Sequence, residues 1–158
     1  FNGPAPQVQK AASPDEEIDI VANWINRHIA AGMQPHEIGV IVRSSDELER
    51  ASKALARAAV PFVALDERMQ SAVGKASVCT MHLAKGLEFR AVAVMDCDDE
   101  VIPSQQRIEQ VTDDSDLAEV YATERHLLYV ACTRAREELL VSGVEPVSEF
   151  LDDLVWTG

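Results

Sequence analysis

Residues 76–95 read ASVCTMHLAKGLEFRAVAVM, and this stretch decides the fold because a polar cluster separates two apolar runs. The runs 76–79 and 91–95 are short and rich in alanine and valine, which is typical of buried strands. Between them stand five residues able to bind a ligand: Thr80, His82, Lys85, Gly86 and Glu88. Because loops at strand ends carry the sites of α/β proteins, the stretch predicts a strand, a functional loop and a second strand. An ordinary turn with a solvated lysine and glutamate is the alternative.

A second informative segment is 124–135, ERHLLYVACTRA, an apolar helix that carries Arg125 and Arg134. At 100° per residue, a regular helix turns these two guanidinium groups to opposite faces, so they cannot share one task. Arg134 follows the most apolar part of the segment, where a guanidinium usually needs a carboxylate or a phosphate partner. A buried ion pair with Glu124 or Glu137 is the alternative to a phosphate.

Together these two segments resemble motifs V and VI of the UvrD/Rep family of superfamily-one DNA helicases. The family patterns read T-x-H-x-A-K-G-L-E-F and E-E-x-R-L-x-Y-V-x-x-T-R-A, and both match nearly residue for residue. A third segment, 38–44 (IGVIVRS), is similar to motif IV, in which a hydrophobic strand delivers an arginine to the nucleotide. The order IV, V, VI agrees with the family, and the resemblance extends to Pro103 and Ser104 and to residues 148–151.

Helix and strand signals alternate along the rest of the chain. Ser13, Pro14 and Glu16 form a capped helix start, and Gly32 is placed to end that helix. Further elements are predicted as strands at 38–42, 60–65 and 139–142, helices at 46–58, around Tyr129 and at 147–154, and a polar loop at 66–75. Such alternation predicts an α/β fold with a mostly parallel sheet covered by helices on both faces. The resemblance identifies this architecture as a RecA-like three-layer domain, the second motor domain of the helicase.

Two segments are predicted to be mobile. Residues 1–12 form a flexible N-terminal segment before a domain that spans residues 13–158. The acidic stretch 107–116 is expected to be a solvated loop that caps the next helix and to bind no metal.

Composition restricts the classes of function. The chain has 158 residues, with 14 Lys and Arg against 27 Asp and Glu, giving a formal charge of -13. This charge argues against a surface that grips nucleic acid by bulk electrostatics, so any DNA contact must be local. The three cysteines are far apart in apolar segments, which indicates buried thiols and a cytoplasmic location rather than disulfides or a metal site. No apolar run is long enough for a membrane span, and a start at Phe1 suggests a fragment.

A phosphate-binding loop of the G-x-x-x-x-G-K-[ST] type is missing, because Gly74 and Lys75 are followed by Ala76. We therefore expect this chain alone not to hydrolyse ATP. In the family, that loop and the ligands of Mg²⁺ belong to the N-terminal RecA-like domain, which becomes the expected partner of this one. The accessory domain that some family members insert before motif V is absent or has been removed, since only residues 66–75 are available for it.

The resemblance assigns two arginines to catalysis. Arg134 is the predicted arginine finger, which stabilises the charge that develops on the γ-phosphate when the cleft between the motor domains closes. Arg43 is the predicted second cation at the same phosphate, and the two guanidinium groups are expected to converge at one edge of the domain. A surface pair of Arg43 with Asp46 or Glu47 is the alternative.

The loop residues are assigned to two ligands. Glu88 is expected to accept hydrogen bonds from the ribose of ATP, Gly86 to let the backbone approach the nucleotide, and Lys85 to steady either Glu88 or a phosphate. Thr80 and His82 are expected to contact the phosphates of single-stranded DNA without reading sequence; a purely structural role is the alternative for His82. The loop then links the nucleotide to the grip on DNA.

Two other classes of function compete with the helicase interpretation. The carboxylates of Asp96, Asp98 and Asp99 follow a predicted strand and could hold Mg²⁺ in a receiver-type or phosphatase-type domain, but the additional carboxylates or lysine of such domains are not evident. The chain could also be a degenerate helicase-like module used only for protein contacts. The predicted function is the motor domain of an ATP-dependent DNA helicase or translocase that serves repair or recombination.

Overall fold

The computed structural model describes residues 4–68 and 73–154 of the chain. Its core is one sheet of six strands in the order β1-β6-β5-β2-β4-β3, and every neighbouring pair is parallel. The strands are β1 (Gln7–Ala11), β2 (Ile38–Val42), β3 (Phe62–Ala64), β4 (Ala76–Thr80), β5 (Phe89–Val94) and β6 (Ala135–Val144). The prediction of an α/β fold with a parallel sheet is confirmed.

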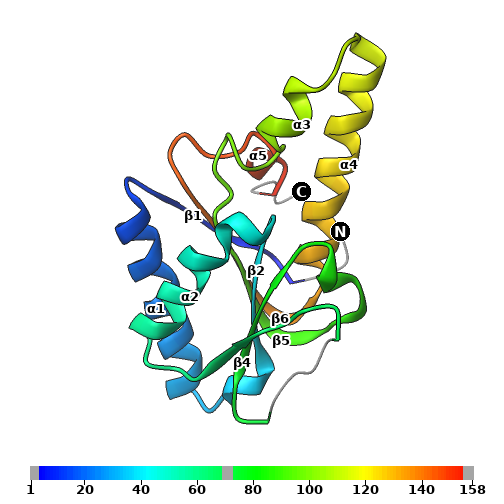
Figure 1. The fold of residues 1–158 in the computed structure, drawn as a ribbon. Coiled ribbons are helices and arrows are strands. Elements are labelled where there is room, and N and C mark those ends of the chain that lie inside the picture. The colour runs from blue at the N-terminus through cyan, green and yellow to red at the C-terminus, as the bar shows by residue number, and fades with distance from the viewer. Residues whose placement is uncertain (1–3, 69–72, 155–158) are drawn as a thin grey trace.

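Helices cover both faces of the sheet, as Figure 1 shows. One face packs against α1 (Pro14–Ala30) and α2 (Leu48–Arg57), and the other against α4 (Asp114–Cys132) and the 3₁₀ turn η3 (Leu83–Gly86). The shorter elements are η1 (Pro35–Glu37), η2 (Ser45–Glu47), α3 (Gln105–Glu109) and α5 (Leu151–Leu154). Two hydrophobic clusters result, one on each side of the sheet. None of the described helices combines the length and apolar composition needed to cross a membrane.

The predicted capping residues at the start and end of α1 are confirmed. The Ser13 hydroxyl accepts a hydrogen bond from the Glu16 amide at 3.1 Å, and Pro14 begins the helix. Gly32 follows the C-cap with φ +107°, a conformation that favours glycine. The helix then buries Val21 and Ile25 against the sheet, which anchors one layer of the domain.

Two predictions about mobile segments are wrong in part. Part of the segment 1–12 forms β1, which pairs with β6 from Gln7, opposite Leu140, to Ala11, opposite Val144. An edge strand is held by backbone hydrogen bonds to one neighbour and does not need a long apolar run. The sequence QVQKA therefore gave only a weak signal for a strand. In the stretch 107–116, α3 extends to Glu109, although Asp113 does cap α4 as expected. Residues 1–3 of the first segment, and residues 69–72 of the predicted loop 66–75, lie outside the described residues.

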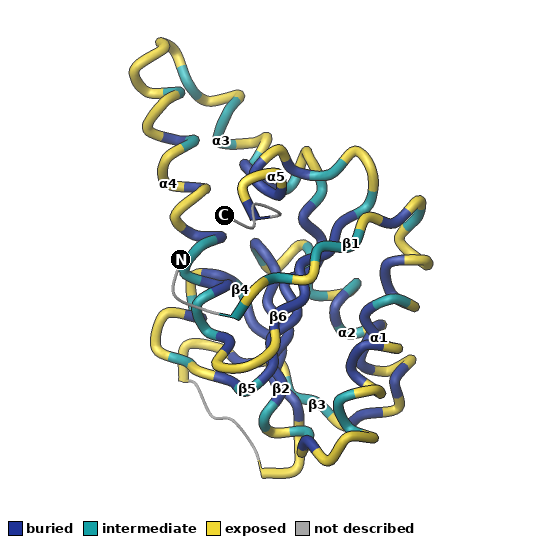
Figure 2. The backbone as a smooth tube through the Cα atoms, turned by 180° about the vertical axis from the view of Figure 1, so that it is seen from behind, coloured by how far each residue is buried: buried dark blue, intermediate teal, exposed yellow. Residues whose placement is uncertain are grey.

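The site depends on the two ends of the parallel strands, which are not the lateral edge strands β1 and β3. We call the side where the strands end, at Val42, Thr80 and Val94, the carboxyl edge, and the side where they begin, at Phe89 and Ala135, the amino edge. The helix α4 begins beyond the carboxyl edge, where α3 and α4 project from the domain, and it runs down to the amino edge (Figure 1). The projecting turn is exposed, whereas the central strands β2, β4 and β5 are almost entirely buried (Figure 2).

Candidate nucleotide and DNA interface

Arg134 lies at the amino edge, in the short turn between α4 and β6. Its Nε donates to the Val130 carbonyl at 3.1 Å and its Nη2 to the Thr133 hydroxyl at 3.1 Å. Its Nη1 donates to the carbonyls of Lys85 at 2.8 Å and Leu87 at 3.2 Å. Within the part of the chain that the structure describes, these four acceptors are all neutral oxygens. The positive charge of Arg134 is therefore held in place without being neutralised by any of them.

The two alternative carboxylate partners of Arg134 are engaged elsewhere. Glu124 binds Arg43, and Glu137 binds Arg90. The other arginine of this segment, Arg125, lies 4.8 Å from the ring centroid of Phe150 and pairs with Asp153 at 3.5 Å. Arg125 and Arg134 thus have different surroundings, and that they serve different tasks stays a prediction.

The motif V loop connects the two edges. Thr80 is the last residue of β4 and lies opposite Val42 at the carboxyl edge, and exposed His82 is the N-cap residue that precedes η3. The loop then descends over the face of the sheet that α4 covers, and the Phe89 amide donates to the Arg134 carbonyl at 2.9 Å. The predicted DNA residues and the predicted nucleotide residues therefore stand at opposite ends of one loop.

Three predicted nucleotide residues are exposed near the amino edge: Lys85, Gly86 and Glu88. Glu88 Oε1 lies 3.8 Å from Nε of Arg136, and both side chains are more than half exposed. A Cβ atom added to Gly86 would meet nothing within 4 Å, so the fold itself does not require glycine at this position. The structure brings Arg134 together with the backbone of Lys85, and it leaves the Glu88 carboxylate open to solvent.

Arg43 is not part of this group. Its Nε and Nη2 donate to Glu124 Oε1 at 2.9 Å and Oε2 at 2.7 Å, and both residues are buried. The same carboxylate accepts from the Ser104 amide at 2.7 Å and from Arg107 Nη1 at 2.8 Å. The alternative pairing of Arg43 with Asp46 or Glu47 is also wrong.

The Glu124 carboxylate is stabilised as an anion. Burial, the largest single influence, raises the pKa of Glu124, but hydrogen bonds from Arg43, the Ser104 amide and Arg107 together outweigh it. The net result is a pKa of Glu124 below its ordinary value. Glu124 and Arg43 therefore form a charged, structural pair that joins β2 to α4.

The predicted convergence of Arg43 and Arg134 at a shared edge is wrong. Ile41 lies opposite Val94, and Val94 lies opposite Val141, so Arg43 stands at the level of β6 near Gly143. Arg134 precedes the start of β6, and nine residues of strand correspond to roughly 30 Å. The sequence contained a signal for this separation, because Arg43 follows a predicted strand and Arg134 precedes one.

A second ionic network fills the carboxyl edge beside α1 and α2. Arg50 Nη1 lies 2.8 Å from Glu17 Oε1, 2.8 Å from Asp96 Oδ1 and 3.1 Å from Asp98 Oδ2. The other Glu17 oxygen accepts from the Ser142 hydroxyl at 2.7 Å and from the Asp96 amide at 2.9 Å. The three carboxylates offer oxygens within 4.8 Å of one another, as a metal site does, but here the guanidinium of Arg50 contacts all three.

This second network holds more negative than positive charge, and one proton compensates. The pKa of Asp96 is raised to about 8, because burial and the charges of Asp98 and Glu17, which raise it, together outweigh the positive charge of Arg50, which lowers it. Asp96 Oδ1 is buried and contacts Arg50 without hydrogen-bond geometry. When Asp96 is neutral, Arg50 faces two negative carboxylates instead of three, so the net negative charge of this network is smaller.

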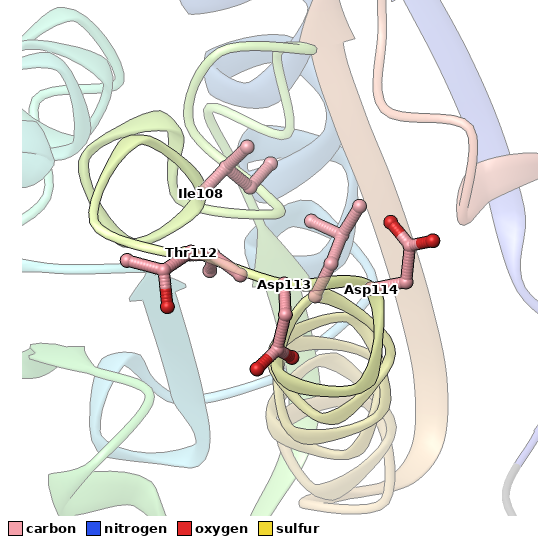
Figure 3. Close-up of a pocket in the computed structure, with 6 residues that line it drawn as sticks. Ile108, Thr112, Asp113 and Asp114 are labelled. Carbon is pink, nitrogen blue, oxygen red and sulfur yellow. The ribbon is translucent and has the colours of Figure 1, made fainter.

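A hollow of about 240 Å³ lies at the projecting turn between α3 and α4 (Figure 3). It is lined by Ile108, Val111, Thr112, Asp113, Asp114 and Leu117. Its carboxylates disfavour a ligand that carries phosphates, so we do not assign the nucleotide to it.

The sequence of this chain is similar to those of known proteins. Residues 65–145, just over half of the chain, match the UvrD-like helicase C-terminal domain. The ATP-dependent DNA helicase UvrD1 of Mycobacterium tuberculosis is 38% identical over 77 residues, which are 49% of this chain and 9% of that protein. The ATP-dependent DNA helicase PcrA of Bacillus subtilis is 32% identical over 83 residues, 51% of this chain and 10% of that protein.

A solved structure extends the likeness to almost the whole chain. The C-terminal domain of a possible DNA helicase from Lactobacillus plantarum WCFS1 superimposes with a TM-score of 0.68 at 25% identity. The match covers 94% of this chain and 80% of that one. Against the curated relatives, by contrast, the chain spans about a tenth of the full length. On the extent of the family match, the chain belongs to the UvrD-like helicase C-terminal domain family.

Proposed function

We propose that this chain is the second RecA-like motor domain of an ATP-dependent DNA helicase or translocase that serves repair or recombination. Its amino edge faces ATP and Mg²⁺ held mainly by an N-terminal RecA-like domain, and that domain supplies the Mg²⁺ ligands. The carrying observation is the set of neutral acceptors around Arg134, which leaves its charge available to a phosphate. Arg43 has no part in this proposal, because Glu124 already neutralises it.

The chemistry of phosphoryl transfer explains why Arg134 matters. ATP supplies the phosphoryl group, and negative charge spreads over its oxygens and the leaving oxygen as the bond breaks. A guanidinium stabilises that charge when it is already oriented and when water is excluded by the facing domain. Arg134 acts as this arginine finger, and Lys85 steadies either a phosphate or Glu88.

The neighbouring residues recognise the rest of the nucleotide. Glu88 accepts hydrogen bonds from the ribose hydroxyls, which its exposed and loosely paired carboxylate is free to do. Gly86 supports the proposal because no neighbouring atom of the fold requires glycine there, and a ligand that approaches the backbone would.

The other end of the loop contacts single-stranded DNA. Thr80 and His82 donate hydrogen bonds to phosphate oxygens with little net charge, which suits a chain whose formal charge is -13. Since Thr80 and Glu88 belong to one loop, the nucleotide state and the grip on DNA are coupled through it.

The deciding experiment is Arg134→Ala in the full-length protein, with ATP turnover measured in the presence of single-stranded DNA. The maximal rate should fall about a thousandfold, the effect typical of losing an arginine finger. Arg125→Ala is the matched control, because it removes an exposed arginine of the same motif that pairs with Asp153; its rate should stay within about twofold. Turnover by Arg134→Ala at the wild-type rate refutes the proposal. A wild-type protein without DNA-stimulated turnover favours the degenerate interaction module instead.

The DNA contact is tested separately with His82→Ala. We expect basal ATP turnover to persist and its stimulation by single-stranded DNA to fall several-fold, because one phosphate contact is lost. His126→Ala, which removes an exposed imidazole from α4, should leave the stimulation unchanged. Full stimulation in His82→Ala removes this residue from the coupling.

A further inference from the structure

The hydroxyl of Thr133 lies between the end of α4 and the guanidinium of Arg134. It donates to the Val130 carbonyl at 2.8 Å and accepts from Arg134 Nη2 at 3.1 Å. The same Val130 carbonyl accepts from Arg134 Nε at 3.1 Å. Hydroxyl, carbonyl and guanidinium thus form a closed ring of three hydrogen bonds.

The ring fixes one side of the guanidinium to a rigid element. The Thr133 amide donates to the Tyr129 carbonyl at 3.0 Å, so the last turn of α4 determines where the hydroxyl stands. An arginine side chain has many rotamers, and an arginine finger works best when that freedom has been removed beforehand. A hydroxyl suits this position because it donates to the carbonyl and accepts from the arginine at once.

We propose that Thr133 is a positioning residue for Arg134, an inference that rests on the proposed function. Thr133 and Val130 hold the Nε and Nη2 side of the guanidinium as a fixed pivot. The Nη1 side lies on the carbonyls of Lys85 and Leu87, and it exchanges them for phosphate oxygens when ATP is present between the closed domains. Thr133 itself touches neither ATP nor DNA in this scheme.

The test compares three substitutions at this position in the full-length protein. Thr133→Val keeps the shape and removes both hydrogen bonds, and Thr133→Ser keeps the hydroxyl. With saturating single-stranded DNA, kcat should fall about 10- to 100-fold in Thr133→Val, whereas the KM for ATP should stay within about twofold, because a misplaced finger affects the transition state rather than binding. Thr133→Ser should return kcat to within about threefold of wild type. Thr133→Ala should lower kcat as much as Thr133→Val does. This second variant tests the loss of the hydroxyl independently of how the valine side chain packs.

Thr123 provides a matched control on the same helix. Its hydroxyl also donates to a backbone carbonyl of the preceding turn, that of Glu119 at 2.9 Å, but it is exposed and far from Arg134 in sequence. Thr123→Val should leave kcat unchanged. Equal kcat values in Thr133→Val and wild type, or equal losses in Thr133→Val and Thr133→Ser, overturn the inference. The proposed function fails separately, through a fully active Arg134→Ala.

Discussion

The arginines at the two edges of the sheet have opposite surroundings. At the carboxyl edge, Arg43 and Arg50 are surrounded by carboxylates that include buried Glu124 and Glu17, and these networks join strands to helices. At the amino edge, Arg134 rests on neutral oxygens and Glu88 is exposed to solvent. Breaking the first kind of contact leaves a buried charge without a partner, whereas the second kind can be exchanged for a ligand at little cost.

The difference teaches how to choose among arginines that occupy motif positions. A guanidinium whose hydrogen bonds go to a buried carboxylate is committed to the fold, and Arg43 is such a case. One that is oriented only by carbonyl and hydroxyl oxygens is both placed and still charged, as Arg134 is. The surroundings of the side chain, rather than its presence in a pattern, identify the residue available for phosphate.

The strongest challenge to this comparison is Glu124→Gln in the 158-residue chain. We expect the free energy of unfolding at pH 7 to fall by about 3 kcal/mol, because the buried guanidinium of Arg43 loses its counter-charge. Since the pKa of Glu124 is lowered in the folded state, the loss should shrink as the pH falls through that pKa. Denaturant unfolding measures it, and Glu119→Gln, an exposed glutamate of the same helix, should change the value by less than about 0.5 kcal/mol. A similar small effect for both variants means that the carboxyl edge is not held by its ion pairs.

A smaller effect is expected for Asp96→Asn, read as a function of pH. The pKa of Asp96 is raised to about 8 in the folded state, so its contribution to stability is complete below its ordinary pKa and is lost as the pH rises through 8. Between pH 5 and 8 the wild-type chain should therefore lose more stability than the variant, by at most about 1.4 kcal/mol per pH unit, the limit for one proton. Asparagine tolerates the φ of 61° at this position, so backbone strain does not confuse the result.

The control for this pH series is Asp99→Asn, which alters an exposed carboxylate of the same loop and should follow the wild-type curve. Parallel curves for Asp96→Asn and wild type contradict the assignment of the extra proton to the cluster around Arg50.

The smallest effect on stability is expected at the amino edge. Glu88→Gln removes an exposed ion pair with Arg136, so the free energy of unfolding should change by less than about 0.5 kcal/mol. In the full-length protein the same change should raise the KM for ATP about tenfold, the value of one charge-assisted hydrogen bond. Glu137→Gln, which alters another exposed glutamate near this edge, should leave the KM unchanged. An unchanged KM in Glu88→Gln separates this carboxylate from the nucleotide.

Much of the fold could be predicted because its signals are local. The apolar runs of β2, β4 and β5 and the cap at Ser13 lie within short stretches of sequence, and all appear in the structure. The strand β1 was missed because an edge strand buries little, so QVQKA lacks a continuous apolar run.

The errors in the site came from contacts that join distant segments. Arg43 and Glu124 are 81 residues apart, and the sequence near either residue does not indicate that the two form an ion pair. Arg43 follows a strand and Arg134 precedes one. In a parallel sheet all strands begin at one side and end at the other, so this difference alone would have predicted that the two residues lie far apart. Thr133 belongs to the motif VI pattern, but the sequence suggested no role for it, because its hydrogen bonds to Val130 and Arg134 are visible only in the structure.

The motif V loop has almost no slack. From Thr80 to Phe89 it descends roughly 20 Å along the sheet and crosses about 10 Å sideways past β2, a straight distance of roughly 22 Å. With four of its residues wound into the 3₁₀ turn, its contour is only about 25 Å. The loop can therefore absorb a displacement of only about 3 Å at one end, and a larger shift of Glu88 must move Thr80 or unwind the turn between them.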